Sequence, residues 1–517
     1  MKKILILLFI AIFSSGSILA GTQWASRPFI ANGESFPANI DPGVAVDFPG
    51  TQSNHNVYET LYQYEYGTLN LRPILATDMS ISDDGTVYTF KLREDVKFHD
   101  GSDFDAEDVK FTYERIKEKN FGMNNFLGGT LSHVEIDGPY DVRIILQARD
   151  ANFIGLLPMV RIVPNTIMEH EVDGDMGNAY LSENMVGTGP YKVSKLARPD
   201  AIHYTAFEDY WGGWEGSHFK DFIFRFGVDF TSGMLQLEEG SVDYFPDVPS
   251  DEIDRLVAKP SVNITFGAVP RSMYFSMNTK AGPLEDVNVR NAINLAFSYE
   301  AMPLIFPNNA YTMSGCLPNN LSDVSYPYEQ RKSDKEAAKK LLADNGYTPG
   351  DIKISLGIVA GFGLEVLAAA MLQEDLAAIG IDLEIVPVTW AVLSTSMTSQ
   401  DTMWDMGALI INAKTPYSGN YLHQLGHSSA AGGNWNWSYY DNPEFDNLLT
   451  EASQSTDPAV RDDRNTKATK YLIDDAVHLC LYGTQNIIGT NAAVKGYVFP
   501  TFTWSRVFDV YSYSLTE

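Results

Sequence analysis

The stretch from Tyr88 to Val109 constrains the fold more than any other part of this sequence, because it combines strand, turn and helix-cap signals. From Val87 to Leu92, the large apolar residues Tyr88, Phe90 and Leu92 occupy every second position, which is the period of a half-buried strand. This strand follows the Asp84-Gly85 turn. Asp105 then stands as an N-cap three residues before Asp108, and an apolar helix face follows. The stretch predicts a hairpin followed by an amphipathic helix.

Further short motifs occur in a fixed order along the chain. They are Gly187–Lys192 (GTGPYK), Asp209–Gly213 (DYWGG), the segment from Asn278 to Ala296 with its Val289-Arg290 pair, and Asn442–Asp446 (NPEFD). With the stretch above, they resemble the peptide/nickel-type extracellular solute-binding proteins of ABC importers, which include the oligopeptide- and dipeptide-binding proteins. The resemblance implies an α/β, two-lobed periplasmic-binding-protein fold with an extra inserted domain, mixed sheets and a hinge between the lobes.

The same resemblance divides the chain into lobes, since no repeat or long linker does so. Two segments that cross between the lobes are expected near residues 267–275 and 481–488. The expected parts are lobe 1 (domain I) from 21–59, 185–269 and 483–517, an inserted domain II from 60–184, and lobe 2 (domain III) from 270–482.

The expected lobe 2 also carries a β-α-β signal of its own. Apolar residues alternate from Ile352 to Ile358, a helical pattern runs to Gly380, and Ile381 to Val388 form a second strand. Before this unit, Ser333 with Glu336 predicts a capping box at the start of a helix. An α/β lobe of this kind, facing another across two crossing segments, predicts a hinge and a cleft.

The first 20 residues have the layout of a signal peptide. Lys2 and Lys3 precede an apolar run that is too short for a membrane span, which needs about 20 residues, and small residues lead to Ala20. No cysteine lies near this expected cleavage point, so we predict a freely diffusing periplasmic protein and not a lipoprotein.

The net charge of −29 makes nucleic acid and anionic membrane surfaces poor partners, because both require basic surfaces. Only Cys316 and Cys480 occur, too few for a disulfide scaffold. The sequence leaves open whether these two cysteines pair.

No enzyme motif has complete spacing. Gly187-Thr188-Gly189 lacks the later glycine of a dinucleotide loop, and Gly426–Ala430 lacks the last glycine of a nucleophile elbow. His423 and His427 have a spacing that a metal could use on a helix. We therefore predict a non-enzymatic protein without a cofactor. A nickel or metal-chelate binder and, more weakly, a secreted hydrolase are the alternatives.

In peptide-binding relatives, tryptophans and an aspartate before a proline line the ligand pocket, and the aspartate holds the peptide's α-ammonium. Aligned on Pro416, Trp390 takes the first tryptophan position and Asn412 takes the aspartate position. No Asp or Glu lies between Asp405 and Asp441, where Lys414 is the only formal charge. A peptide held by its amino end is therefore disfavoured at this position.

The same region is rich in aromatic residues, which form flat platforms with a few polar handles. Tyr417, Trp435 and Trp437 are further ligand candidates, and Glu34 lies in a loop that in relatives can reach the cleft. We predict a monomeric binding protein that captures an oligopeptide or oligosaccharide and delivers it to an inner-membrane ABC permease. The ligand's identity, length and affinity do not follow from the sequence.

Overall fold

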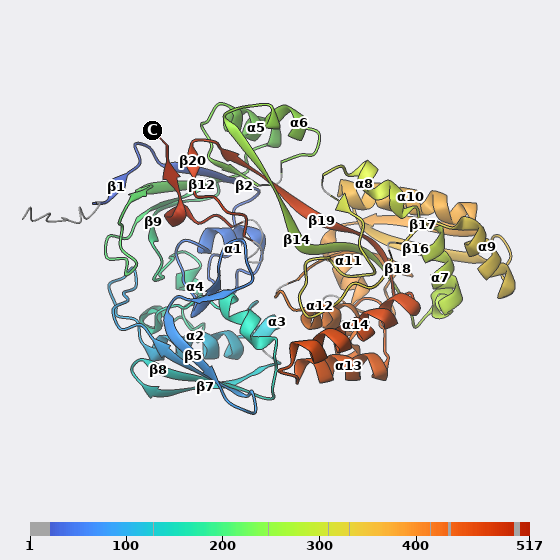
Figure 1. The fold of residues 1–517 in the computed structure, drawn as a ribbon, viewed down its shortest axis with the longest axis horizontal. Helices are drawn as coiled ribbons and strands as arrows, with labels where there is room; N and C mark the ends of the chain where they lie inside the picture. Colours follow the sequence, from blue (N-terminus) through green and yellow to red (C-terminus); the bar gives the residue numbers. More distant parts are fainter. Residues whose placement is uncertain are drawn as a thin grey trace, which may run out of the picture.

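The computed structural model describes residues 21–127, 129–246, 248–308, 310–329, 331–413, 415–432, 436–500 and 507–516. Figure 1 shows two lobes joined by two long neighbouring strands, β14 (Val262–Met277) and β19 (His478–Asn491). The fold is mixed α/β, as the sequence predicts.

One mixed sheet of 11 strands, counted over the described residues, passes from one lobe into the other. Its order is β17-β16-β18-β14-β19-β13-β2-β12-β10-β9, and β15 pairs with β19. The other strands of this sheet are β2 (Phe29–Gly33), β9 (Tyr191–Ala197), β10 (Ala201–Ala206), β12 (Asp221–Phe226), β13 (Tyr244–Phe245), β15 (Ala310–Tyr311), β16 (Ile352–Val359), β17 (Ile381–Val388) and β18 (Met406–Asn412).

Both predicted crossing segments fall within β14 and β19. Residues 271–277 of β14 pair with β18 in lobe 2, whereas β19 pairs with β13 in lobe 1. The β14–β19 register shifts between Ala268 and Ser272, where Pro270 lies, and again between Met273 and Tyr274. Because proline has no N–H to donate, the ladder is interrupted at the point where the chain passes between lobes.

A four-stranded antiparallel sheet, β5-β6-β8-β7, lies below the body of lobe 1 in Figure 1. Asp105 caps α2 and forms the predicted capping box with Asp108. The elements of this region are β3 (Tyr62–Tyr64), β4 (Leu71–Pro73), β5 (Ala76–Ile81), β6 (Val87–Leu92), α2 (Ala106–Glu118), α3 (Asn124–Leu127), β7 (Leu131–Gly138), β8 (Asp141–Leu146), the 3-10 helices Phe153–Met159 and Asn165–His170, and α4 (Asn178–Leu181).

The predicted β-α-β unit of lobe 2 is confirmed, because β16 and β17 pair in parallel along their whole length and α10 (Gly363–Ala378) connects them. The predicted capping box at Ser333 is wrong. Asp334 caps the helix instead by accepting from Ala337 N at 2.8 Å, and the Ser333 hydroxyl donates to Ala296 O. The other helices of this lobe are α7 (Val287–Ala296), α8 (Met302–Ile305), α9 (Lys335–Asp344), α11 (Trp390–Met397), α12 (Ser418–Gly426), α13 (Pro443–Ser453) and α14 (Pro458–Asp474).

Cys316 and Cys480 form a disulfide across 164 residues of sequence, which answers the question that the sequence leaves open. Both cysteines belong to the apolar core beneath α12 and α14. The bridge therefore fastens the 310–324 region to β19 inside lobe 2.

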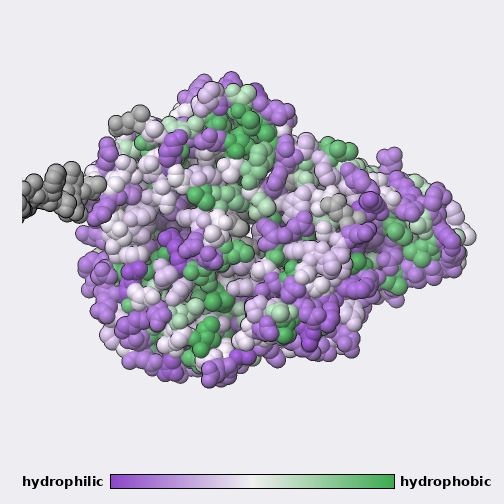
Figure 2. All heavy atoms as spheres, viewed as in Figure 1, coloured by the Kyte–Doolittle hydropathy of each residue, from purple (hydrophilic) through white to green (hydrophobic). Residues whose placement is uncertain are grey.

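The remaining strands and α-helices of the described residues lie in the body of lobe 1. They are β1 (Gln23–Trp24), α1 (Phe48–Asn54), β11 (Ser217–His218), α5 (Phe230–Glu238), α6 (Ile253–Val257), β20 (Val494–Lys495) and β21 (Ser514–Leu515). Figure 2 shows hydrophilic residues over much of this face, with an apolar area over α5 and α6. Among the described residues, no helix has the length and apolar character needed to cross a membrane.

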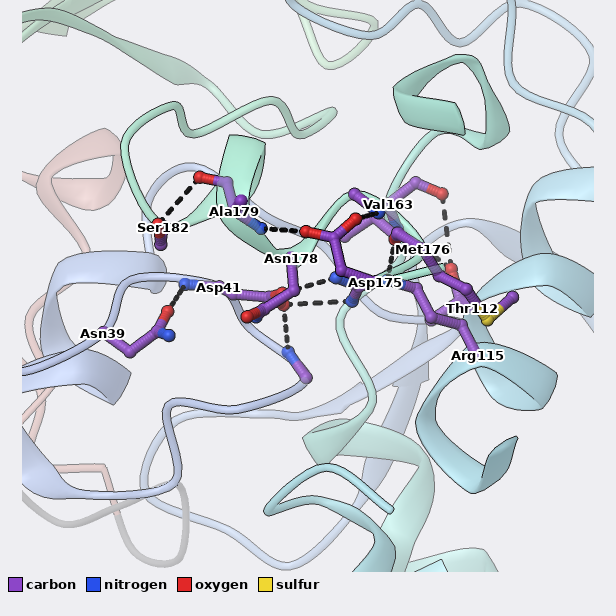
Figure 3. A network of polar contacts seen from close by, with 12 residues as sticks. Asn39, Asp41, Thr112, Arg115, Val163, Asp175, Met176, Asn178, Ala179 and Ser182 are labelled. Carbon is purple, nitrogen blue, oxygen red and sulfur yellow. Dashed lines mark hydrogen bonds and ion pairs between the residues drawn. The ribbon is translucent and has the colours of Figure 1, made fainter. Parts of the chain in front are cut away.

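A buried ion pair joins the N-terminal part of lobe 1 to α2 (Figure 3). Asp41 and Arg115 are both almost fully buried, and the Arg115 Nη1–Asp41 Oδ1 distance is 3.0 Å. Asp41 also accepts from Gly43 N at 2.9 Å and Asn178 Nδ2 at 2.7 Å, while Arg115 Nε donates to Met176 O at 2.7 Å. The carboxylate thus holds three segments together.

Candidate functional site

The candidate site lies at one edge of the lobe 2 sheet. β16 runs parallel to both β17 and β18, so the carboxyl ends of these three strands meet at this edge. Open α/β sheets bind ligands outside the carboxyl ends of their strands. Phe362 follows β16, Trp390 follows β17, and Asn412 ends β18. Figure 1 places α11, which begins at Trp390, on the side of lobe 2 nearer lobe 1.

Trp390 presents an exposed aromatic surface at this edge. It is the first residue of α11, whose N-cap is Thr389, and it is 47% exposed. Its ring centroid lies 5.9 Å from that of Trp437, with 35° between the planes. Trp437 is only 1% exposed, so it supports Trp390 from below and presents no platform of its own in this conformation.

Arg271 borders the predicted anchor position. Asn412 and Arg271 are directly opposed on β18 and β14, which places both side chains on the same face of the sheet. Arg271 donates from Nε to Thr484 Oγ1 at 2.5 Å and from Nη2 to Asn486 Oδ1 at 3.1 Å. Sequence reasoning missed this cation because its strand is far from Asn412 in the sequence, and no local pattern links the two residues.

Sequence reasoning also missed Phe362 and Glu365, which lie at the same edge. Phe362 is 38% exposed and directly precedes α10. Glu365 is buried in the first turn of α10 and accepts from Val359 N at 2.7 Å. Burial raises the pKa of Glu365 to about 7, so a carboxyl group that ionises near neutral pH lies at this edge. The Gly-Phe-Gly sequence after β16 was the available signal for a tight turn with an exposed aromatic residue.

Tyr417 lies where lobe 2 contacts the region around the first 3-10 helix. A Cβ atom added at Gly155 would lie 2.8 Å from the Tyr417 ring, so the two pack closely. Nearby, Ala151 N donates to Ser453 O at 2.8 Å. Burial raises the pKa of Tyr417. Its ring therefore contacts the protein itself, and its role toward a ligand stays a prediction.

The other predicted site residues lie apart from this edge or cannot be placed. Glu34 is exposed in the loop after β2, and its backbone carbonyl accepts from Gly227 N at 3.2 Å. Lys414 and Trp435 lie outside the described residues. Their assignments remain predictions.

His423 and His427 are stacked at 4.5 Å between ring centroids. Ser429 Oγ lies 3.2 Å from His423 Nε2 and 2.8 Å from His427 Nδ1. Burial lowers the pKa of His423 to about 4. Over the described ranges, no three or more His, Cys, Asp or Glu side chains are grouped so that they could hold a metal ion.

The chain is similar to several known proteins over most of its length. It is 28% identical to "Heme-binding protein A" of Haemophilus influenzae over 505 residues, covering 92% of this chain and 90% of that protein. It is 26% identical to "Probable D,D-dipeptide-binding periplasmic protein DdpA" of Escherichia coli over 482 residues, covering 90% of each.

The fold is similar to that of the periplasmic binding protein DppA from Helicobacter pylori, solved in complex with the peptide STSA, with a TM-score of 0.80 and 24% identity. That match covers 95% of this chain and 98% of the other. Residues 70–433 match the family model "Bacterial extracellular solute-binding proteins, family 5 Middle". The chain therefore belongs to the bacterial extracellular solute-binding proteins of family 5.

Proposed function

We propose that this protein captures a short oligomeric nutrient, an oligopeptide or an oligosaccharide, between its two lobes and delivers it to an inner-membrane ABC permease. It works as a periplasmic monomer that is secreted through its signal peptide. It makes and breaks no bond in its ligand, in keeping with relatives that are named as binding proteins.

The observation that carries this proposal is the exposed indole of Trp390, supported by Trp437, at the edge of lobe 2 that faces lobe 1. Large exposed aromatic residues at a strand edge are typical of ligand platforms, because one face stays apolar while nearby amides provide polar contacts. Asn412 supplies such an amide, with two donors and one acceptor.

The charges at this edge bear on how the ligand is oriented. Burying an α-ammonium without a counter-charge costs roughly 3–5 kcal/mol. Glu365 is buried and accepts from Val359 N, so it does not serve as the counter-charge of an ammonium group. Arg271 adds a positive charge beside Asn412. A peptide ligand should therefore place its carboxylate end, and not its amino end, beside Arg271, whereas an oligosaccharide requires no charge there.

Closure of the lobes supplies the signal to the permease. The proposed division remains 21–59, 185–269 and 483–517 for lobe 1, 60–184 for the inserted domain and 270–482 for lobe 2. The hinge lies at the interrupted β14–β19 ladder around Pro270. A ligand that touches both lobes only in the closed form shifts the population toward it by its differential affinity.

Calorimetry tests the proposal with four probes: a free tetrapeptide library, the same library N-acetylated, the same library C-amidated, and short oligosaccharides. Binding that survives N-acetylation and is lost on amidation supports the peptide orientation, and oligosaccharide binding supports the neutral alternative. Failure of all four probes to bind, or conversion of a bound probe to product, would overturn the proposed function.

A further inference from the structure

A cavity of about 310 Å³ is lined by residues of lobe 1 and of the 60–184 region, and Trp390 is not among its lining residues. It opens where the body of lobe 1 meets the β3–β4 hairpin and the segment after the first 3-10 helix. Its lining includes both charged and aromatic side chains. Its titratable lining residues include His55, Glu59, Tyr66, Arg72, Arg161 and Asp509.

Arg161 is the buried cation of this cavity. It is 5% exposed, and its Nη2 donates to Thr51 O at 3.3 Å. Its Nη1 is buried and finds no hydrogen-bond partner in the described part of the chain. Burial lowers the pKa of Arg161 only to about 10, so the guanidinium stays charged at neutral pH. Among the described residues, Arg161 has no ion-pair partner, and the neighbouring Tyr58 is neutral at that pH because burial raises its pKa.

The two acidic groups of the cavity have hydrogen-bond partners other than Arg161. Glu59 accepts hydrogen bonds at 2.9 Å from Thr188 Oγ1, Tyr210 OH and Trp211 Nε1, and burial raises its pKa to about 7. Asp509 accepts from Ser512 Oγ at 2.5 Å and interacts with Tyr66 and Arg72, and burial raises its pKa. In the described part of the chain, neither carboxyl group forms an ion pair or a hydrogen bond with Arg161.

The remaining titratable groups add no negative charge. His55 Nε2 lies 2.7 Å from Tyr66 OH, and burial, together with Arg161 and Arg72, lowers the His55 pKa to about 3, so it is neutral. Arg72 is exposed at the mouth and donates to Gln63 Oε1 at 3.0 Å. Two guanidinium groups therefore face the cavity, and one of them is deeply buried with a free donor.

We propose that this cavity binds a small oxyanion, a carboxylate or an inorganic phosphate, with Arg161 as the buried donor and Arg72 as a second contact at the mouth. A buried charge needs a counter-charge, and a guanidinium matches the paired oxygens of such anions. A water occupies about 30 Å³ of liquid, so the cavity has room for a small anion with several waters. Bound there, the anion fastens the β3–β4 region to the body of lobe 1. The site is independent of the proposed nutrient site.

Thermal unfolding of the full chain, dialysed free of oxyanions, tests this proposal at constant ionic strength. The midpoint should rise with each tenfold increase of sodium phosphate or sodium acetate above a sodium chloride baseline. A rise with phosphate alone indicates inorganic phosphate as the ligand, and a rise with acetate indicates a carboxylate. The same small shift in every salt, chloride included, would overturn the proposal.

Variants separate this site from general salt effects. Arg161→Gln should abolish the oxyanion dependence, and Arg72→Gln should weaken anion affinity at least tenfold by calorimetry. Arg225→Gln is the matched control, since Arg225 is a partly buried arginine of lobe 1 that lies outside the cavity and contacts Asn32 and Gln236. Should Arg161→Gln not fold, Arg72→Gln decides alone, because unchanged anion affinity in that variant refutes the site.

Discussion

Replacing Asp41 by asparagine should strongly destabilise the protein. The substitution keeps the shape of the side chain but removes the negative charge that faces Arg115 (Figure 3). The new amide group either points its NH₂ toward the guanidinium or leaves one of the guanidinium donors without an acceptor. Arg115 has almost no exposure, so water cannot replace the lost counter-charge. Breaking a buried pair in this way costs about 3–5 kcal/mol.

Urea unfolding followed by tryptophan fluorescence measures this loss. With a slope of about 3 kcal/mol per M, the midpoint should fall by about 1 to 1.7 M. Asp137→Asn is the matched control, because Asp137 pairs with Arg143 on the surface and should leave the midpoint unchanged.

A second variant tests the cause of the loss. Adding Arg115→Met to Asp41→Asn removes the uncompensated charge, so the double variant should regain much of the lost stability. If Asp41→Asn unfolds at the same urea concentration as Asp137→Asn, the buried pair does not hold these segments together and the reasoning is refuted.

Three further predictions concern the ligand, the disulfide and pH. Trp390→Ala should weaken nutrient binding by about 2 kcal/mol, roughly 30-fold in calorimetry, whereas Leu304→Ala, at an 81% exposed site on α8, should not; equal affinities would exclude the platform. Replacing Cys316 and Cys480 by alanine should lower unfolding free energy by about 5 kcal/mol, because the bridge closes a loop of 164 residues; an unchanged urea midpoint would contradict this. The Glu59 pKa rises from 4.5 to about 7 on folding, so this group destabilises the native state progressively as pH rises between those values. Glu59→Gln should therefore gain about 3 kcal/mol relative to wild type between pH 4.5 and pH 8 in urea unfolding; a pH-independent difference would contradict it.

Local elements of this fold could be predicted because neighbouring residues determine them. The capping box of Asp105 and Asp108 and the β-α-β unit of lobe 2 occur where turn, cap and periodicity signals agree. The prediction at Ser333 was wrong because Asp334 competes for the same cap. The Ser333 hydroxyl donates instead to Ala296 O, a contact with another helix that the local sequence does not reveal.

The candidate site could be predicted only in part. The family resemblance predicted Trp390 as a ligand contact, and its exposure agrees with a platform. Trp437 looked equivalent in sequence, yet it is buried beneath Trp390. The position of Arg271 beside Asn412 depends on which strands pair, which a single sequence does not reveal.

The amino-acid sequence by itself determined the local elements, because those depend on residues close together in the chain. It also determined the acidic character and the family pattern, because composition and the order of motifs are independent of which residues meet in space. Only the tertiary structure decided that Cys316 pairs with Cys480, that Asp41 meets Arg115, and that Arg161 lines a cavity with an Nη1 that has no hydrogen-bond partner among the described residues. The physical reason is that these contacts form between residues far apart in sequence, and folding sets their partners, burial and charge environment together.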